Sequence, residues 1–212
     1  MLIIPKRSYH ITTNAHHRFR KHKNLVSTMN IEKPESVWVS DITYVGTRTN
    51  PSYLALITDA YSKKIVGYDV SKSLSMDGSF RALEMAVNNR KYKESPLIHH
   101  SDRGLQYCSN EYQRLLEKNE IKPSMTEKYD PYENAIAERI NGILKQEFSI
   151  AQKIKDFKIK KKLVKNAIEI YNNIRPHLSN EMLTPIQMHA QKKIRPKQYK
   201  SKKLNNDLIV QL

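Results

Sequence analysis

The amino-acid sequence predicts an α/β domain in which helices cover the faces of a mixed, five-stranded β-sheet. Three β-rich runs with short links come first, at residues 37–45, 53–61 and 64–70, and this spacing indicates an antiparallel meander. The period of the apolar residues then changes from two to about 3.6, and helices alternate with shorter strands. Such an order of elements predicts one mixed sheet with helices on its faces.

The second half of the predicted domain alternates helices with short strands. One helix is expected after Ser75, where apolar residues recur at helical spacing, and another after Ser109, whose hydroxyl makes a good N-cap. The short strands are the apolar runs at residues 96–101 and 121–125. Together with the meander, these two runs bring the number of predicted strands to five.

Two longer helices follow, at residues 134–148 and 154–173. Apolar residues recur at helical spacing in both of them. In the first helix the residues expected to face inward are Ile136, Ile140, Ile143 and Leu144. In the second helix they are Leu163, Ala167, Ile170 and Tyr171, opposite a face of lysines. Residues 175–212 are basic and punctuated by proline, and no regular element is predicted there.

The charge of the chain is unevenly distributed. The formal net charge of +16 comes from residues 1–36, which carry +5, and residues 151–212, which carry +11, while residues 37–150 are neutral. A bias of this kind predicts binding to a polyanion, and nucleic acid is the expected partner. It also suggests a basic N-terminal arm or remnant of an upstream DNA-binding region, a central core, and a basic C-terminal helix and tail.

Several classes of protein are excluded by composition. No apolar run reaches the length of about 18 residues that a membrane-spanning helix needs, so no membrane partner is expected. The first residues lack the features of a secretory signal. The single cysteine, Cys108, excludes an internal disulfide and any zinc site that needs two thiolates. A cytoplasmic protein is expected.

Three acidic residues occupy positions from which they can meet. Asp41 lies at the end of the first strand, Asp102 directly follows the fourth, and Glu138 lies on a helix. If those two strands are neighbours, their acids emerge side by side, and a helix packed across that end brings the glutamate to them. Three carboxylates at one place repel one another unless a cation holds them. Oxygen ligands favour Mg²⁺ or Mn²⁺, and two such ions suit chemistry at a phosphodiester.

Each acid taken alone also fits an ordinary role. An aspartate at a strand end is often a turn or cap residue, which applies to Asp41 and Asp102. A helical glutamate next to an arginine, as at Glu138, is often a solvated partner in a surface ion pair. The metal site is therefore predicted from the combination of the three.

Four motifs resemble those of OrfB transposases of bacterial insertion sequences, a family that shares the core of retroviral integrases. They stand in the family's order at residues 38–44 (Trp-Val-Ser-Asp-Ile-Thr-Tyr), 99–107 (His-His-Ser-Asp-Arg-Gly-Leu-Gln-Tyr), 132–138 (Tyr-Glu-Asn-Ala-Ile-Ala-Glu) and 171–177 (Tyr-Asn-Asn-Ile-Arg-Pro-His). Between Asp102 and Glu138 lie 35 residues, which is the family's spacing.

The resemblance implies a ribonuclease H-like fold and the metal chemistry of a DDE transposase. It maps the metal-binding acids onto Asp41, Asp102 and Glu138. The implied reaction is cleavage at the 3′ ends of the element followed by strand transfer to target DNA, without a covalent protein–DNA intermediate. The implied partners are element ends and target DNA, a homo-oligomer on DNA, and a small helix-turn-helix protein from the preceding reading frame. The implied location is the bacterial cytoplasm, at the nucleoid.

Basic side chains are candidates for contact with DNA. Lys145 lies two helical turns after the helical acid and matches a basic position of the family, although an ordinary exposed lysine is the alternative. His100 shares the strand face of the second acid by period two, so it can point at the site. Arg175 either binds phosphate or fastens the last helix to the core. Residues 158–162, Lys161 among them, are expected to contact backbone phosphates without reading sequence.

Two further residues are expected to have structural roles, and two alternatives to an active transposase remain. Asn134 is expected to cap the helix of Glu138, and Asp59 to serve a turn rather than a metal. The chain starts where family members carry further DNA-binding segments, so an inert DNA-binding remnant is the main alternative to an active enzyme. A ribonuclease H-like nuclease acting on RNA–DNA hybrids is a third possibility. The three intact acids favour the enzyme.

Overall fold

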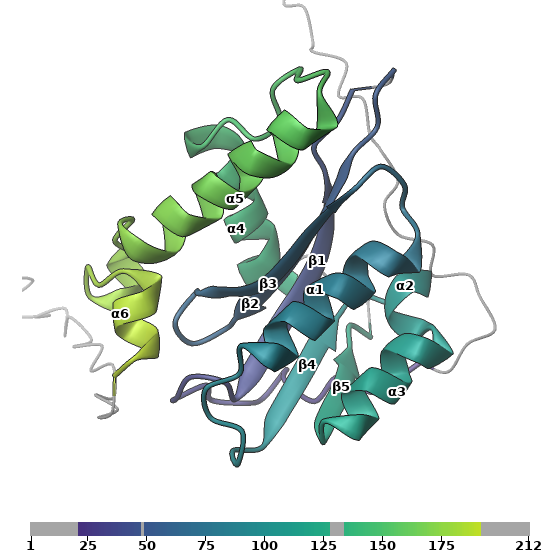
Figure 1. The fold of residues 1–212 in the computed structure, drawn as a ribbon. Coiled ribbons are helices and arrows are strands. Elements are labelled where there is room, and N and C mark those ends of the chain that lie inside the picture. Colours follow the sequence, from purple (N-terminus) through teal and green to yellow (C-terminus); the bar gives the residue numbers. More distant parts are fainter. Residues whose placement is uncertain (1–20, 48, 128–133, 192–212) are drawn as a thin grey trace, which may run out of the picture.

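The fold is described from a computed structural model, which covers residues 21–47, 49–127 and 134–191. One sheet of five strands forms its centre, in the order β3-β2-β1-β4-β5 (Figure 1). Its first three strands are antiparallel, whereas β1 pairs in parallel with β4 and β4 in parallel with β5. The predicted mixed five-stranded sheet is therefore confirmed.

The strands lie where the sequence places them, to within two residues. Their bounds are Val37–Tyr44 for β1, Tyr53–Asp59 for β2, Ile65–Ser71 for β3, Leu97–Ser101 for β4 and Ile121–Met125 for β5. The loop after Asp59 joins the second and third strands as the predicted hairpin.

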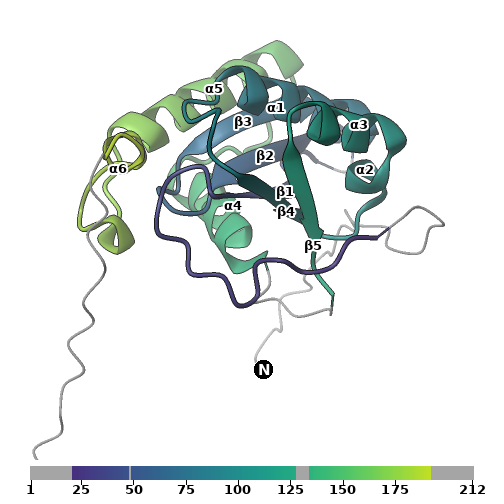
Figure 2. The same cartoon turned by 90° about the horizontal axis from the view of Figure 1, so that it is seen from below.

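Helices cover both faces of the sheet (Figure 2). Against one face lie α1 (Met76–Asn88), α2 (Leu105–Cys108) and α3 (Asn110–Lys118). Against the other lie α4 (Ala135–Glu147) and α5 (Phe157–Asn173). A short 3-10 turn, η2 (Leu178–Asn180), and α6 (Pro185–His189) follow α5. The predicted cap at Ser109 is confirmed, because its hydroxyl accepts from the Tyr112 amide.

Alternation along β1 decides which side chains reach each face. Trp38 and Ile42 pack into the cluster covered by α1, α2 and α3. Val37 and Val39 point to the opposite face, where they meet Ala137 of α4. Odd-numbered positions of this central strand, which include position 41, therefore face the α4 side.

The inner face of α5 differs from the predicted one. Its buried side chains are Lys160, Val164, Ala167, Ile168 and Tyr171. Ile170, predicted to face inward, is 45% exposed, so that prediction is wrong. The stripe is shifted because Lys160 takes a core position: its ammonium group donates to the carbonyl of Val45 at 3.2 Å and contacts the Ser52 hydroxyl at 3.4 Å. A lysine can bury its stem in this way when its amine finds oxygen partners.

No break in packing separates the predicted core from the predicted C-terminal part. Val164, Ala167 and Tyr171 of α5 share a hydrophobic cluster with Leu54 and Leu56 of β2. Across the described residues, no helix combines the length and apolar content needed to cross a bilayer. Residues 1–20, the larger part of the predicted N-terminal arm, lie outside the described residues, as does the predicted tail from residue 192.

A buried polar cluster, the His189 cluster, ties α6 to the start of the fold. It consists of Glu35, Asp59, Ser62 and His189. Asp59 accepts from the amide of Glu35 at 2.6 Å and from the amide of Ser62 at 2.7 Å, which agrees with the turn role predicted for it. The His189 ring lies 3.2 Å from the Glu35 carboxylate, 3.1 Å from the Ser62 hydroxyl and 3.7 Å from the Asp59 carboxylate.

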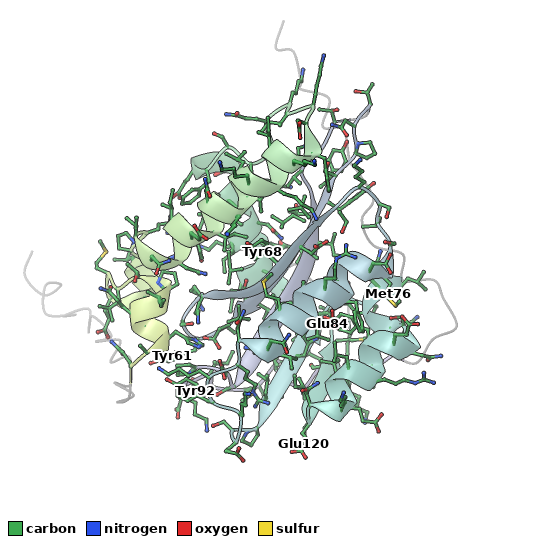
Figure 3. The ribbon with its side chains drawn as sticks, viewed as in Figure 1. Tyr61, Tyr68, Met76, Glu84, Tyr92 and Glu120 are labelled. Atoms are coloured by element: carbon green, nitrogen blue, oxygen red, sulfur yellow. The ribbon has the colours of Figure 1, made fainter. Side chains whose placement is uncertain are left out.

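Tyr92, labelled in Figure 3, also holds α6 in place, since its hydroxyl donates to the His189 carbonyl at 3.0 Å. Burial alone would lower the pKa of His189, but contacts with Asp59 and Glu35 raise it above its ordinary value. Burial would raise the pKa of Glu35, but His189 and the amides of Lys91 and Tyr92 lower it. The charged forms of both side chains are thus favoured in the folded protein.

Replacement of His189 by alanine should lower the free energy of unfolding by about 3–5 kcal/mol, because it takes the imidazole away from two buried carboxylates. Since the pKa of His189 is raised on folding, its contribution is fully present below pH 6.5 and declines as pH rises through the folded value. Urea unfolding at several pH values should show the largest difference between variant and wild type in acid. A constant difference at all pH values would contradict the charged form. Lys165→Ala, in an exposed ion pair, is the control.

Candidate metal centre

Asp41 stands near the middle of the sheet, on β1, opposite Leu56 of β2. Its side chain is half-buried on the α4 side, where the Asn141 amide donates to its Oδ2 atom at 2.7 Å. Parallel pairing of β1 with β4 brings Val39 opposite His100. Two residues further along the two strands come Asp41 and Asp102, so the register places these acids at the same end of neighbouring strands.

The turn after β4 fixes the second acid. Oδ1 of Asp102 accepts a hydrogen bond from the Gly104 amide at 2.9 Å. A Cβ atom on Gly104 would lie only 2.9 Å from the same oxygen. Any other residue at position 104 would therefore displace the carboxylate, so this glycine allows the close approach that orients Asp102.

Helix α4 carries the third acid across the sheet. Asn134 occupies the N-cap position but makes no capping bond with its side chain, so the predicted cap is wrong. Its side-chain amide instead donates to the carbonyl of Ser40 at 3.2 Å. This contact ties the start of α4 to β1 one residue before Asp41. Glu138 lies in the first turn of the helix and is exposed, three residues before Asn141 on the same helical face.

The charges of the other two acids act on the pKa of Asp41. Burial and the charge of Asp102 raise the pKa of Asp41 to about 7, and the charge of Glu138 adds to the shift, while Asn141 opposes it. Mutual repulsion of this kind is what a bound cation relieves. Within the described part of the chain, no three His, Cys, Asp or Glu side chains stand close enough to hold a metal together. The arrangement is thus a carboxylate pair with a third, exposed acid nearby.

The donor set suits a hard cation. Asp41 and Asp102 offer oxygen atoms only, which is the chemistry that Mg²⁺ and Mn²⁺ prefer. Because the side chain of Glu138 is exposed, a change of rotamer towards the pair meets little packing resistance. Asp41 and Asp102 therefore fit a divalent metal ion by their chemistry and by the repulsion between them, and Glu138 would join them only after such a change of rotamer.

Lys145 lies on the site side of α4, one turn beyond Asn141. Burial lowers the pKa of its half-buried ammonium group, and the charge of Asp41 acts in the opposite direction. The helix thus presents Glu138, Asn141 and Lys145 in one row towards the acids of the strands.

Two other residues that were predicted to contact DNA make hydrogen bonds within the protein. His100 does share the strand face of Asp102, but it is fully buried and its Nδ1 atom lies 2.9 Å from the Ser124 hydroxyl of β5. A buried imidazole offers DNA no surface, which argues against the predicted contact. Arg175 forms two bonds of 2.6 Å to the carboxylate of Glu147, so it fastens the end of α5 to α4.

The lysine cluster at residues 158–162 divides into two groups. Lys158, Lys161 and Lys162 are exposed, and Lys161 stacks over the Phe157 ring at 5.3 Å. Lys160 is buried and is no candidate for phosphate contact. The exposed members stay candidates for DNA binding.

Asn141 is the site residue that the sequence reasoning missed. It is 4% exposed, and its Nδ2 atom donates to Asp41, whereas its Oδ1 atom has no hydrogen-bond partner within the described residues. Its position three residues after Glu138 was the available signal, because that spacing places a polar side chain on the same helical face.

Two family models, both described as integrase core domain, match the chain at residues 31–131 and 119–185. A 31 kDa protein of insertion element IS600 from Shigella sonnei is 36% identical over 174 residues, which cover 81% of this chain and 64% of that one. The putative transposase InsK of IS150 from Escherichia coli is 31% identical over 159 residues, covering 75% of this chain and 56% of that one. The putative transposase of IS986/IS6110 from Mycobacterium tuberculosis is 37% identical over 118 residues, covering 54% and 42%.

Solved structures agree in fold at lower identity. A chain of the simian T-cell lymphotropic virus intasome matches with a TM-score of 0.65 and 20% identity, covering 87% of this chain and 63% of that one. The HTLV-2 integrase catalytic core in complex with magnesium matches with a TM-score of 0.58 and 20% identity, covering 74% and 97%. The ribonuclease H-like fold is thereby confirmed.

The chain spans less than two thirds of the length of each of the three curated relatives described above. The matches nevertheless extend from before β1 to the start of α6, and they include the strands and the helix that carry the three acids. On this evidence the chain belongs to the OrfB-like insertion-sequence transposases that contain an integrase core domain.

Proposed function

We propose that this chain is the catalytic part of a DDE transposase, which cleaves the 3′ ends of its element and joins them to target DNA. The observation that carries the proposal is the pair of Asp41 and Asp102 on neighbouring parallel strands. Burial, and then the charge of Asp102, raise the pKa of Asp41 to about 7, and the charge of Glu138 adds to the shift. Further support comes from relatives named as putative transposases and from an integrase core solved with magnesium.

Asp41, Asp102 and Glu138 are the residues that would hold two Mg²⁺ or Mn²⁺ ions. Such ions supply an activated water or 3′-hydroxyl and stabilise the leaving oxygen of a phosphodiester. Asn141 orients Asp41 through its 2.7 Å bond, and the Gly104 amide orients Asp102 through its 2.9 Å bond. Both carboxylates are therefore oriented before the reaction starts, which lowers the entropic part of the activation free energy.

Basic side chains would hold the DNA backbone beside the acids. Lys145 is near enough to Asp41 to respond to its charge, so a phosphate bound there lies close to the metal site. The exposed lysines of α5 widen this surface, and they are Lys158, Lys161, Lys162 and Lys165. Contacts of this kind position DNA without reading its sequence. Recognition of element ends would then require other parts, such as a homo-oligomer on DNA and a helix-turn-helix partner from the preceding reading frame.

An inert protein that only occupies element ends is the second candidate. It is favoured by the exposed position of Glu138, since no three acidic side chains of the described residues stand close enough to hold a metal together. The two functions share DNA binding and differ in metal-dependent chemistry. A ribonuclease H-like nuclease would be recognised by preferential degradation of an RNA–DNA hybrid over DNA ends.

Asp102→Asn should reduce Mg²⁺-dependent nicking of a labelled oligonucleotide, copied from DNA that flanks the coding region, by more than about 100-fold. Asparagine keeps the oxygen that accepts from the Gly104 amide but loses the charge that a cation needs. Binding of the oligonucleotide should stay unchanged. Glu84→Gln, on the exposed face of α1 (Figure 3), is the control and should nick normally.

Retained nicking by Asp102→Asn would contradict the assigned site. Absence of nicking by the wild-type chain joined to its upstream region would contradict the enzyme and favour the inert candidate.

Asn141→Leu should lower the nicking rate or the affinity for Mg²⁺ by about 10–100-fold, since Asp41 loses the donor that fixes its orientation. Leucine keeps the branched shape and the number of heavy atoms of the asparagine side chain, and the buried Oδ1 atom without a partner is removed, so the thermal midpoint should change little. Gln146→Leu, at an exposed position of the same helix, provides the comparison. Equal Mg²⁺ affinity and rate in Asn141→Leu and wild type would show that Asp41 is placed without this residue.

Replacement of the four exposed α5 lysines by glutamine should weaken DNA binding to a similar extent for all sequences. Each lost phosphate contact reduces the slope of log affinity against log salt by about 0.9. Fluorescence anisotropy over a salt series measures this slope. Lys118 and Lys122, near the opposite edge of the sheet, serve as control positions. An unchanged slope would place the DNA surface elsewhere on the protein.

A further inference from the structure

Tyr107 carries a buried hydroxyl group that makes no hydrogen bond of ordinary geometry among the described residues. The residue lies on α2 and is 2% exposed. No hydrogen bond of ordinary geometry reaches its hydroxyl within the described residues, although the Ser40 side chain lies near enough to interact with the hydroxyl and lower its pKa. A buried hydroxyl in this condition destabilises a protein by about 1–3 kcal/mol. A phenylalanine would fill the same space without that cost.

The neighbouring tyrosine differs in this respect. Tyr112 is also fully buried, and its hydroxyl lies 2.9 Å from the Nε2 atom of His99. Burial lowers the pKa of His99 to about 3, so the ring is neutral and can share this hydrogen bond. The same small cluster therefore contains one hydroxyl that stabilises the fold and one without such a role.

Tyr107 is held beside the second acid of the site. Its amide donates to the Gly104 carbonyl at 3.1 Å. A Cβ atom on Gly104 would lie 2.9 Å from Oδ1 of Asp102 and 3.6 Å from Cδ2 of Tyr107, so the carboxylate and the ring both border this glycine. After burial, the charge of Asp102 and then that of Asp41 are among the causes that raise the pKa of Tyr107 well above its ordinary value.

The ring has little freedom to turn away. It meets Tyr112 edge to face, with centroids 5.5 Å apart and planes at 81°. It also contacts His99, with centroids 6.2 Å apart. The ring is therefore held at one place beside the Asp102 turn by packing that does not involve the hydroxyl itself.

We propose that Tyr107 is a positioning residue whose hydroxyl donates a hydrogen bond to the Asp102 carboxylate when that acid binds a divalent cation. A carboxylate has about four acceptor sites, so it can accept from the Gly104 amide and from Tyr107 and still bind metal. Donors behind a metal ligand fix its orientation, and their loss commonly weakens metal binding by 10–100-fold. The inference rests on the proposed function, because it needs Asp102 to be a ligand.

The experiment compares Tyr107→Phe with the matched variant Tyr112→Phe in the full chain. Titration calorimetry measures the dissociation constant for Mg²⁺ alone, and thermal unfolding measures stability. Tyr107→Phe should raise the dissociation constant by about tenfold without lowering the thermal midpoint. Tyr112→Phe should lower the thermal midpoint, because His99 loses its partner, and leave the dissociation constant unchanged.

The outcomes separate the two proposals. If wild type binds Mg²⁺ and loses it in Asp102→Asn, an unaltered dissociation constant in Tyr107→Phe would overturn the role of Tyr107 alone. An equal loss of Mg²⁺ affinity in both tyrosine variants would also overturn it, since general loosening of the cluster would then explain the effect. A wild-type chain that binds no Mg²⁺ would overturn the proposed function together with this inference.

Discussion

The parallel pairing of β1 with β4 is the constraint on which the site depends. Its register sets Val39 opposite His100, and the same register carries Asp41 and Asp102 to one end of the two strands. Two like charges are brought together there by backbone hydrogen bonds that lie in the middle of the sheet. Burial, and then the charge of Asp102, raise the pKa of Asp41 to about 7. The sheet can maintain this repulsion because its stability comes from two large hydrophobic clusters, one on each face.

Single polar contacts then place the helices relative to that pair. Asn134 joins the start of α4 to β1, and the buried amine of Lys160 joins α5 to the end of the same strand. Asn50 adds a second tie, since its amide donates to the carbonyl of Lys155 just before α5. Hydrophobic packing alone allows helices to slide by a fraction of a turn, whereas these directional bonds do not. The row that carries Glu138 and Asn141 is thereby held over the strand acids.

Much of this fold is predictable from local sequence, because strand alternation and helical spacing depend on neighbouring residues. The five strands, the helix over Glu138 and the turn role of Asp59 belong to this group. Long-range contacts decide the rest. Lys160 is a core residue only because Val45 and Ser52 meet its amine. For this reason the buried face of α5 differs from the predicted one. Helix α6 was missed although Thr184 and Gln187 form a capping box around Pro185. The roles of Asn141 and Tyr107 follow from which acid lies across from them. No local pattern contains that information.

The His189 cluster has a consequence for the order in which the protein acquires its stability during synthesis. Glu35 and His189 are 154 positions apart, and together with Asp59 they form one buried unit. A growing chain folds from its N-terminal side, so both carboxylates are made long before the imidazole that compensates them. Until α6 has been made, Glu35 has Arg90 at 3.9 Å and two backbone amides as partners, while the imidazole is still missing. The domain therefore gains this part of its stability last, after the strands and the helix that carry the three acids have been made.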